Sequence, residues 1–270
     1  MDRLSKRRWL ITGVSGGLGR ALAEAALARG DTVVGTLRGD TADFERLAPG
    51  RAHAIRLDLS HLPEIPSAID RAITRLGGID VLVNNAGYCL AGAVEEVAET
   101  ETQDIFAVNL FAPLAIIRAA LPHLSAAGSG RIINISSLAA VESYPGLGLY
   151  CASKAALSAL SETLALEVRP LGVHVTAVEA GGMRTGFAGP SLRKAARRFA
   201  AYLPMRNKIE EGFRHSDGKQ ANDPAAMALA LLKLSELDQP PARLLMGDRA
   251  LERVEAALDA RRALYRSHRL

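Results

Sequence analysis

The stretch Trp9-Leu10-Ile11-Thr12-Gly13-Val14-Ser15-Gly16-Gly17-Leu18-Gly19 decides how this chain folds. A short apolar run leads into closely spaced glycines, and an alanine-rich segment of helical period follows over residues 18–29. A strand, a glycine turn and a helix in this order can hold a pyrophosphate, because the helix N-terminus presents free N–H groups to it. The spacing departs by one residue from GxGxxG, so taken alone it fits a mere tight turn equally well.

The same alternation continues along the chain. Short apolar runs predict strands at residues 9–12, 32–37, 54–57, 81–84, 131–135, 173–178 and 244–246. Segments of helical period lie at residues 18–29, 64–76, 101–126, 149–168 and 224–236, and a charged helix is expected from Ala250 onward. Strands that alternate with helices are typical of a parallel sheet. The sequence predicts an α/β fold, a Rossmann-type doubly wound sheet of about seven strands with helices on both faces.

Length and composition indicate one ordinary globular domain spanning residues 1–270. The chain has 270 residues, 49% hydrophobic and 23% charged, which suits a single domain with a sizeable core. Its two cysteines cannot form a disulfide scaffold, so we expect a cytoplasmic protein. The longest apolar run, at residues 110–121, is interrupted by Pro113 and Arg118, and no membrane span is expected.

The basic charge does not by itself predict a nucleic-acid partner. The net charge is +4, aromatic residues make up only 4% of the chain, and the excess basic residues lie mainly at 193–214 and at the C-terminus. A solvated surface explains this distribution better.

A long segment interrupts the rhythm after the sixth predicted strand. Residues 186–221 are rich in arginine, lysine, glycine and proline, and segments of this kind usually form a lid or are disordered. The segment follows the carboxyl end of a strand, where α/β sheets bind ligands, so we expect a substrate lid. Its basic residues fit a solvated lid face or, alternatively, a site for an anionic substrate: Arg193, Lys194, Arg197, Arg198, Arg206 and Lys208.

The end of the second predicted strand bears on the cofactor. It reads Thr36-Leu37-Arg38, with no acid before Asp40. NAD sites place an acidic residue there for the ribose diol, whereas an arginine accommodates the 2′-phosphate of NADP. The residues favour NADP(H) over NAD, and the alternative is that Arg38 is only a surface charge.

A second pattern lies at Tyr150-Cys151-Ala152-Ser153-Lys154, thirteen residues after Ser137. Residues four apart share one face of a helix, so Tyr150 and Lys154 are expected to be neighbours. An ammonium close to a phenol lowers the pKa of the phenol, and a phenol that titrates nearer neutrality suits proton transfer to a substrate oxygen. Alone, the pair also fits an exposed tyrosine and lysine on a helix.

Together these patterns resemble the short-chain dehydrogenase/reductase family over roughly residues 8–185. The motifs that carry the resemblance occur in the expected order on the expected β–α segments: the turn at 12–19, Asp58-Leu59, Asn84-Asn85-Ala86-Gly87, Asn109, Ser137, Tyr150 and Lys154.

The resemblance implies a role for each residue. Tyr150 is the expected general acid in reduction and base in oxidation, and Lys154 tunes it and binds the nicotinamide ribose. Ser137 is expected to bond the substrate carbonyl, and Asn109 to hold a water that links Lys154 to solvent. The expected cofactor-binding residues are Gly13, Ser15, Gly16, Gly17, Leu18, Gly19, Arg38, Asp58, Leu59, Asn85, Ala86, Gly87, Tyr150, Lys154 and Thr185. Asn84 fits better as a strut between strands, and no metal site is expected.

One position departs from the family pattern. The family usually has Pro-Gly after the sixth strand, followed by a threonine, and this chain has Ala180-Gly181 with Thr185 at the retained spacing. Alanine leaves φ less restricted and restores an N–H. We expect a modest effect on cofactor affinity.

The predicted function is NADP(H)-dependent hydride transfer between nicotinamide and a ketone or secondary alcohol. A non-catalytic dinucleotide-binding regulator on the same fold, or an epimerase or dehydratase of the family, are the alternatives. The expected partner is a small-molecule carbonyl or alcohol. An apolar pocket wall is suggested by Pro145, Gly146, Leu147, Leu149 and Met183. The resemblance also implies a homodimer or homotetramer paired through the helices at 101–126 and 149–168.

Overall fold

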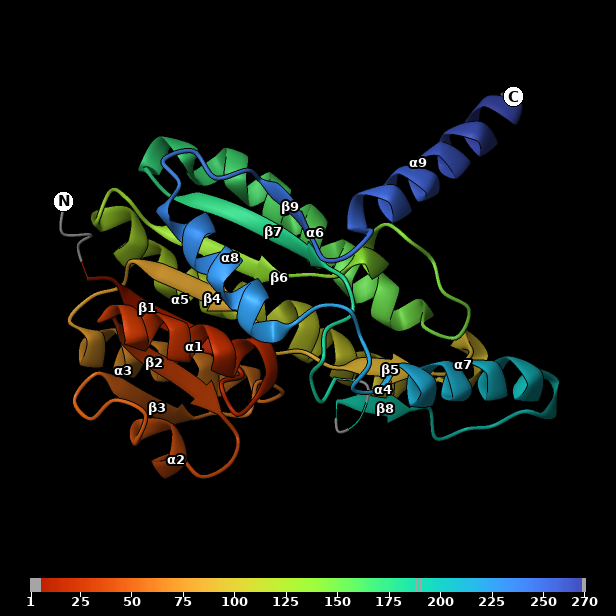
Figure 1. The fold of residues 1–270 in the computed structure, drawn as a ribbon, viewed down its shortest axis with the longest axis horizontal. Helices are drawn as coiled ribbons and strands as arrows, with labels where there is room; N and C mark the ends of the chain where they lie inside the picture. Colours follow the sequence, from red (N-terminus) through yellow and green to blue (C-terminus); the bar gives the residue numbers. More distant parts are fainter. Residues whose placement is uncertain (1–5, 188, 190, 269–270) are drawn as a thin grey trace.

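A parallel sheet forms the centre of the protein, whose computed structural model describes residues 6–187, 189 and 191–268 (Figure 1). Within these residues seven strands pair in the order β3-β2-β1-β4-β6-β7-β9, and every pair is parallel. The strands are β1 (Arg8–Thr12), β2 (Thr32–Leu37), β3 (Ala52–Arg56), β4 (Val81–Asn84), β6 (Arg131–Ile135), β7 (His174–Ala180) and β9 (Arg243–Met246). The predicted doubly wound fold is confirmed.

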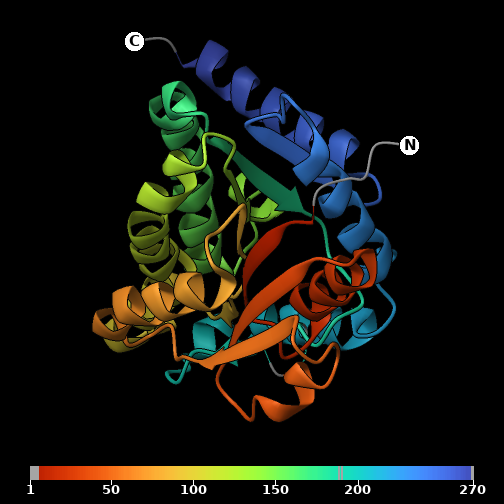
Figure 2. The ribbon, with the colours of Figure 1, turned by 90° about the vertical axis from the view of Figure 1, so that its left-hand side faces the viewer.

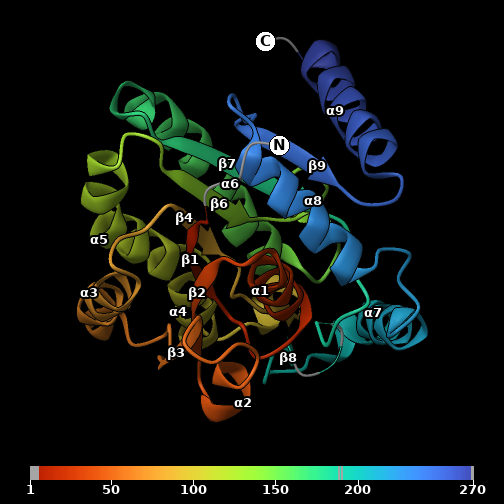
Figure 3. The ribbon, with the colours of Figure 1, turned by 60° about the vertical axis from the view of Figure 1, so that its left-hand side comes forward.

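Helices cover both faces of the sheet (Figure 3). On one face lie α1 (Gly17–Arg29), the short α2 (Ala42–Glu45) and α8 (Pro224–Glu236), and on the other lie α3 (Ile65–Leu76), α5 (Ala112–Ala126) and α6 (Gly148–Val168). Alternate strand residues feed the two cores: Trp9 and Ile11 pack on the α1 side, and Leu10 packs on the α3 side. Because both faces are covered, the strands are mostly apolar, which is why short apolar runs predicted them.

The helix predicted at 101–126 is a continuous rod with an internal irregularity. It consists of α4 (Glu99–Phe106), a π-helical turn (Ala107–Phe111) and α5. By length and composition alone this rod could cross a membrane, which the sequence analysis did not expect. Ile116, Ala120 and Leu124 are buried in the core beside α3, and core helices of globular proteins share this composition.

The segment 186–221, apart from residues 188 and 190, which lie outside the described residues, has secondary structure that the sequence did not predict. It contains β8 (Leu192–Lys194), a 3₁₀ turn (Ala200–Tyr202) and α7 (Leu203–Ser216). β8 pairs in parallel with β5 (Cys89–Ala91), so the segment is joined to the loop that follows β4 (Figure 1). The 3₁₀ turn Val94–Glu96 follows β5.

The last helix, α9 (Ala250–Ser267), buries apolar side chains in its first turns. Ala250 and Val254 are buried against Leu138, whereas Leu258 and Leu264 are exposed where the helix extends away from the sheet (Figures 1 and 2). The helix expected from Ala250 is confirmed, and its charged composition reflects this exposure.

Gly35, in the middle of β2, lets the glycine turn approach the sheet. A Cβ at Gly35 would overlap the side chain of the fully buried Val14. We expect Gly35→Ala to lower the free energy of unfolding by about 1–3 kcal/mol through overpacking. Thermal unfolding measures this, with a loss of about 2–4 °C in Tm for each kcal/mol.

Gly39→Ala is the matched control, because a Cβ at the exposed Gly39 meets no atom within 4 Å. We expect its effect to stay within about 0.5 kcal/mol. The double variant Gly35→Ala with Val14→Ala should recover part of the lost stability. Equal Tm values for the Gly35 and Gly39 variants would contradict the overpacking account.

Candidate active site

The glycine turn brings the start of α1 close to the carboxyl end of β1. Gly13 has a φ of +74°, and the N–H groups of Gly13 and Val14 donate to the Thr36 carbonyl at 2.9 and 3.1 Å. A Cβ on Gly19 would overlap the Gly13 carbonyl, so this position requires glycine. No side chain caps the N-terminus of α1 and no acid lies in its first turn. The free N–H groups and the helix dipole therefore suit an anion such as a phosphate.

Thr12 and Asn85 tie the ends of β1 and β4 together. The Thr12 hydroxyl accepts the N–H groups of Asn85 at 2.9 Å and Ala86 at 3.0 Å. The Asn85 amide donates to the carbonyls of Thr12 at 2.8 Å and Gly13 at 3.2 Å. Asn84 Nδ2 donates to Asn134 Oδ1 at 2.8 Å, which places Asn84 as the expected strut between strands.

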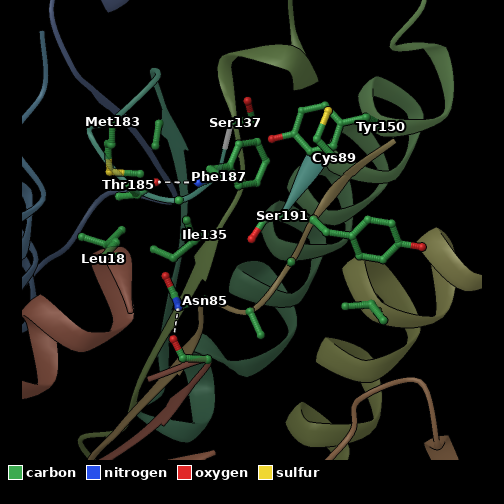
Figure 4. Close-up of a pocket in the computed structure, with 18 of the residues that line it drawn as sticks. Leu18, Asn85, Cys89, Ile135, Ser137, Tyr150, Met183, Thr185, Phe187 and Ser191 are labelled. Atoms are coloured by element: carbon green, nitrogen blue, oxygen red, sulfur yellow. Dashed lines mark hydrogen bonds between the residues drawn. The ribbon is translucent and has the colours of Figure 1, made fainter. Parts of the chain in front are cut away.

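A cavity of about 740 Å³ opens at this edge of the sheet (Figure 4). It brings together most of the predicted site residues: Gly13, Ser15, Gly16, Gly17, Leu18, Arg38, Asp58, Leu59, Asn85, Ala86, Gly87, Ser137, Tyr150, Lys154 and Thr185. Gly19 and Asn109 are buried and do not line it. Gly19 packs behind the wall, and the expected role of Asn109 in holding a water stays a prediction.

One end of the cavity holds a carboxylate next to a guanidinium. Asp58 accepts the Ser60 N–H at 3.0 Å and the Ser60 hydroxyl at 2.8 Å. The hydrogen bond from the Ser60 N–H, with a further contribution from the charge of Arg38, lowers the pKa of Asp58. Arg38 directly follows β2 and is exposed, so its charge is available to a ligand.

The middle of the cavity holds the tyrosine and lysine of α6, both almost completely buried. Lys154 Nζ donates to the Ile135 carbonyl at 2.8 Å, and burial lowers the pKa of Lys154 to about 8. Burial raises the pKa of Tyr150, and the Ser137 hydroxyl only partly opposes this. The expected lowering of the Tyr150 pKa is therefore wrong for this structure, because removal of the phenol from water is the largest influence on it.

Ser137 begins the 3₁₀ turn Leu138–Ala140, and its hydroxyl oxygen accepts the Ala139 N–H at 3.1 Å. The hydroxyl hydrogen is not used by this contact, so it can donate to a ligand. Figure 4 shows Ser137 and Tyr150 on neighbouring sides of the cavity.

Asn109 lies in the π-helical turn and supports the wall from behind. Its Oδ1 accepts the Tyr88 N–H at 3.1 Å, and its Nδ2 donates to the Tyr88 carbonyl at 3.0 Å and to Ser153 Oγ at 3.1 Å. A Cβ on Gly87 would lie 3.0 Å from Asn109 Oδ1 and 3.3 Å from Lys154 Nζ. Asn109 Oδ1 and Lys154 Nζ therefore both lie next to Gly87, and Asn109 Oδ1 keeps one lone pair for a further donor.

Several wall residues were not predicted from the sequence. The Phe187 ring lies 5.8 Å from the Tyr150 ring at an angle of 54°, and the Phe187 N–H donates to Thr185 Oγ1 at 3.3 Å. Leu147 and Met183 line the cavity as expected, whereas residues 145, 146 and 149 do not. Further unpredicted wall residues with large side chains include Tyr88, Tyr144, Phe213 and Arg253, and Arg193 of the expected lid also lines the cavity. Tyr88 and Tyr144 lie in loops without a periodic pattern, whereas Phe213 and Arg253 lie on the helices α7 and α9, whose packing against the cavity is not a local property of the sequence.

The basic residues of segment 186–221 mostly bind acidic groups or carbonyls of the protein itself. Lys194 and Arg198 approach Glu210, and Arg206 binds Glu96. Arg193 lies 4.2 Å from the centre of the Tyr88 ring, in a cation–π contact. Most of this basic cluster is therefore internal pairing and not a free charged surface.

Comparison with known proteins places this site in a family. The family model described as short chain dehydrogenase matches residues 7–196. The chain is 35% identical over 247 residues, 90% of each chain, to "Oxidoreductase BOA17" of Botryotinia fuckeliana.

Solved structures agree with this match. A short-chain dehydrogenase from Streptomyces avermitilis superposes with a TM-score of 0.89 at 38% identity, covering 99% of this chain and 97% of that one. A 3-ketoacyl-(acyl-carrier-protein) reductase from Brucella melitensis complexed with NADH is 26% identical, with a TM-score of 0.73 over 90% of this chain and 97% of that one. A Burkholderia cenocepacia short chain dehydrogenase in complex with NADP is 28% identical, with a TM-score of 0.72 over 91% and 98%. The chain belongs to the short-chain dehydrogenase family of oxidoreductases.

Proposed function

We propose that the protein is an NADP(H)-dependent oxidoreductase that interconverts a ketone and a secondary alcohol, with Tyr150 as the general acid and base. The observation that carries the proposal is that Tyr150, Lys154 and Ser137 line the same cavity as the uncapped N-terminus of α1. The cofactor, when bound, supplies or accepts the hydride. The protein has to bind the cofactor, orient the carbonyl and move one proton.

The cavity residues fit a dinucleotide. The free N–H groups of α1 suit the pyrophosphate, and the Asp58 carboxylate suits the exocyclic amine of adenine. Gly87 leaves room beside Lys154 Nζ, where a side chain would crowd the lysine. Thr185 packs against Gly17 and keeps a hydroxyl hydrogen for the nicotinamide carboxamide.

The protonation states favour carbonyl reduction at neutral pH. With its pKa raised by burial, Tyr150 is a neutral phenol that can donate its proton to the carbonyl oxygen as the carbon gains the hydride. The Ser137 hydroxyl can donate a second hydrogen bond to the same oxygen, where negative charge develops. Asn109 Oδ1 and Lys154 Nζ, which both lie next to Gly87, can hold the water that returns a proton to Tyr150.

The walls next to Tyr150 support a bulky apolar ketone as substrate. Phe187, Phe213 and Leu147 surround this part of the cavity with aromatic and aliphatic surface. Burial of apolar substrate area against these side chains favours binding by about 25 cal/mol for each Å².

We also propose that the protein forms a homodimer or homotetramer. Phe111 on the rod from α4 to α5 and Leu166 on α6 are 46% and 73% exposed, on the helices that the family resemblance assigns to subunit pairing. Exposed apolar side chains of this size suit a homodimer or homotetramer interface. The free thiols of Cys89 and Cys151 suit the reducing cytoplasm.

Tyr150→Phe tests the acid. We expect kcat for reduction of a ketone to fall by about 10²–10⁴, because the phenyl ring cannot donate a proton. Oxidation of NADPH followed at 340 nm over a panel of carbonyl compounds measures the loss. The Kd for NADPH should change by less than about twofold, since binding common to ground and transition states is retained.

Tyr202→Phe is the control, because the Tyr202 hydroxyl bonds the exposed Glu95 outside the cavity. It should retain full activity. A Tyr150→Phe protein as active as wild type would exclude Tyr150 as the acid, and a wild type that binds NADPH without reducing any carbonyl would support a regulator.

Arg38→Ala tests the cofactor preference. We expect wild type to have a higher kcat/KM with NADPH than with NADH. In the variant, kcat/KM with NADPH should fall about tenfold or more, because a charge-assisted contact to phosphate contributes about 1.5–3 kcal/mol. The kcat/KM with NADH should not fall. Arg46→Ala, in an exposed ion pair with Asp43, is the control. An enzyme that prefers NADH, or is indifferent to Arg38, would refute the preference.

The pH dependence tests Lys154. Because burial lowers its pKa to about 8, Lys154 loses its proton in the free enzyme as the pH rises through about 8. We expect kcat/KM for NADPH, which reports groups of the free enzyme, to be level below pH 7 and to fall about tenfold per unit well above pH 8. Lys154→Met should lower kcat/KM for NADPH below pH 7 and abolish its fall above pH 8. A profile that stays level to pH 10 would show that this charge is not required.

A further inference from the structure

Glu96 is a fully buried carboxylate outside the cavity. It ends the 3₁₀ turn Val94–Glu96, has 0% exposure, and does not line the cavity. Its Oε2 accepts the Ala93 N–H of its own turn at 3.1 Å. Its Oε1 accepts the Phe199 N–H at 2.8 Å and pairs with the Arg206 guanidinium. One buried charge therefore binds two residues of segment 186–221 at once.

Further contacts converge on the same point. Arg197 donates to the carbonyls of Glu96 at 3.4 Å and Val97 at 2.8 Å. Arg206, whose side chain is only 13% exposed, also donates to the Phe199 carbonyl at 2.9 Å. Because a buried charge left without its partner is strongly unfavourable, these contacts permit one arrangement of segment 186–221 and penalise others.

The Arg206 contact fixes the direction of α7. Arg206 and Phe213 are seven residues apart and share a face of this helix. A Cβ on Gly146 would overlap Ile209 and lie 3.3 Å from Met205 Cε, so α7 packs closely on the loop at 144–147. From this packed position α7 presents Phe213 and Ser216 to the cavity, and the loop presents Tyr144 and Leu147.

We propose that Glu96 is a positioning residue that holds α7 as a fixed wall of the substrate cavity and so determines which ketones fit beside Tyr150. The inference rests on the proposed carbonyl reductase function. Glu96 acts through Arg206 and Phe199, and it touches neither the cofactor residues of the glycine turn nor Tyr150.

Glu96→Gln removes the charge and keeps the size of the side chain. We expect kcat/KM for the bulky ketone 2-decalone to fall by about ten- to a hundredfold, because a wall displaced by about 1 Å misorients the carbonyl. The kcat/KM for acetone, which does not reach α7, should fall less than about threefold, and the Kd for NADPH should not change. The control is Glu99→Gln, an exposed carboxylate whose side chain accepts a hydrogen bond from Gln103 of its own helix.

Amide hydrogen exchange measures how firmly α7 is held in place, and it requires no catalytic turnover. In Glu96→Gln the amides of residues 199–216 should exchange at least about tenfold faster, while those of 131–135 in β6 keep their protection. Arg206→Lys, which keeps a charge for Glu96, should shift exchange and decalone kinetics in the same direction to a smaller extent. This milder variant covers the case in which Glu96→Gln does not fold.

Two results would overturn the proposal. One is unchanged exchange at 199–216 with unchanged decalone kinetics. The other is equal losses for acetone and 2-decalone together with weaker NADPH binding, which would indicate general damage to the fold. A wild type that reduces neither ketone would instead reject the proposed reductase function, and the exchange measurement would still decide whether Glu96 anchors α7.

Discussion

The contact between Thr12 and Asn85 is the constraint on which the rest of the site depends. Parallel strands place all their carboxyl ends at one edge of the sheet, so the turns that leave this edge are free to diverge. The Thr12 hydroxyl and the Asn85 amide prevent this. They join the turn that follows β1 to the turn that follows β4 through four hydrogen bonds. The cleft between them therefore has a set width, and the uncapped end of α1 faces the same space as Gly87 and Lys154.

Burial determines the chemistry of that space. Tyr150 and Lys154 are neighbours on α6, yet removal from water moves their pKa values in opposite directions, toward a neutral phenol and a more easily neutralised amine. A neutral phenol is the form that donates a proton to a carbonyl oxygen. The cationic nicotinamide ring of an oxidised cofactor would favour phenolate, which is the form that oxidation of an alcohol requires.

Segment 186–221 shows how a charge pattern on its own can mislead. Its arginines and lysines read equally well as a solvated lid or an anion-binding surface, whereas the structure pairs most of them with Glu96, Glu210 or backbone carbonyls. The acidic partners lie on another loop or on the following helix, so no local spacing connects them with the basic residues. These contacts and the pairing of β8 with β5 make the segment part of the cavity wall.

The sequence by itself determined the order of the seven strands of the main sheet and of the helices that cover it, the family, and the motif residues that meet at the cavity, because hydrophobic period, glycine spacing and the Tyr150–Lys154 pair are local properties. It also indicated which residue types gather at the sheet edge, since parallel strands end there together. Only the tertiary structure decided that Gly19 and Asn109 lie behind the wall, that Phe187 and Phe213 belong to it, and in which direction the pKa of Tyr150 moves. These properties depend on burial and on contacts between residues far apart in the chain, and no local spacing records either of them.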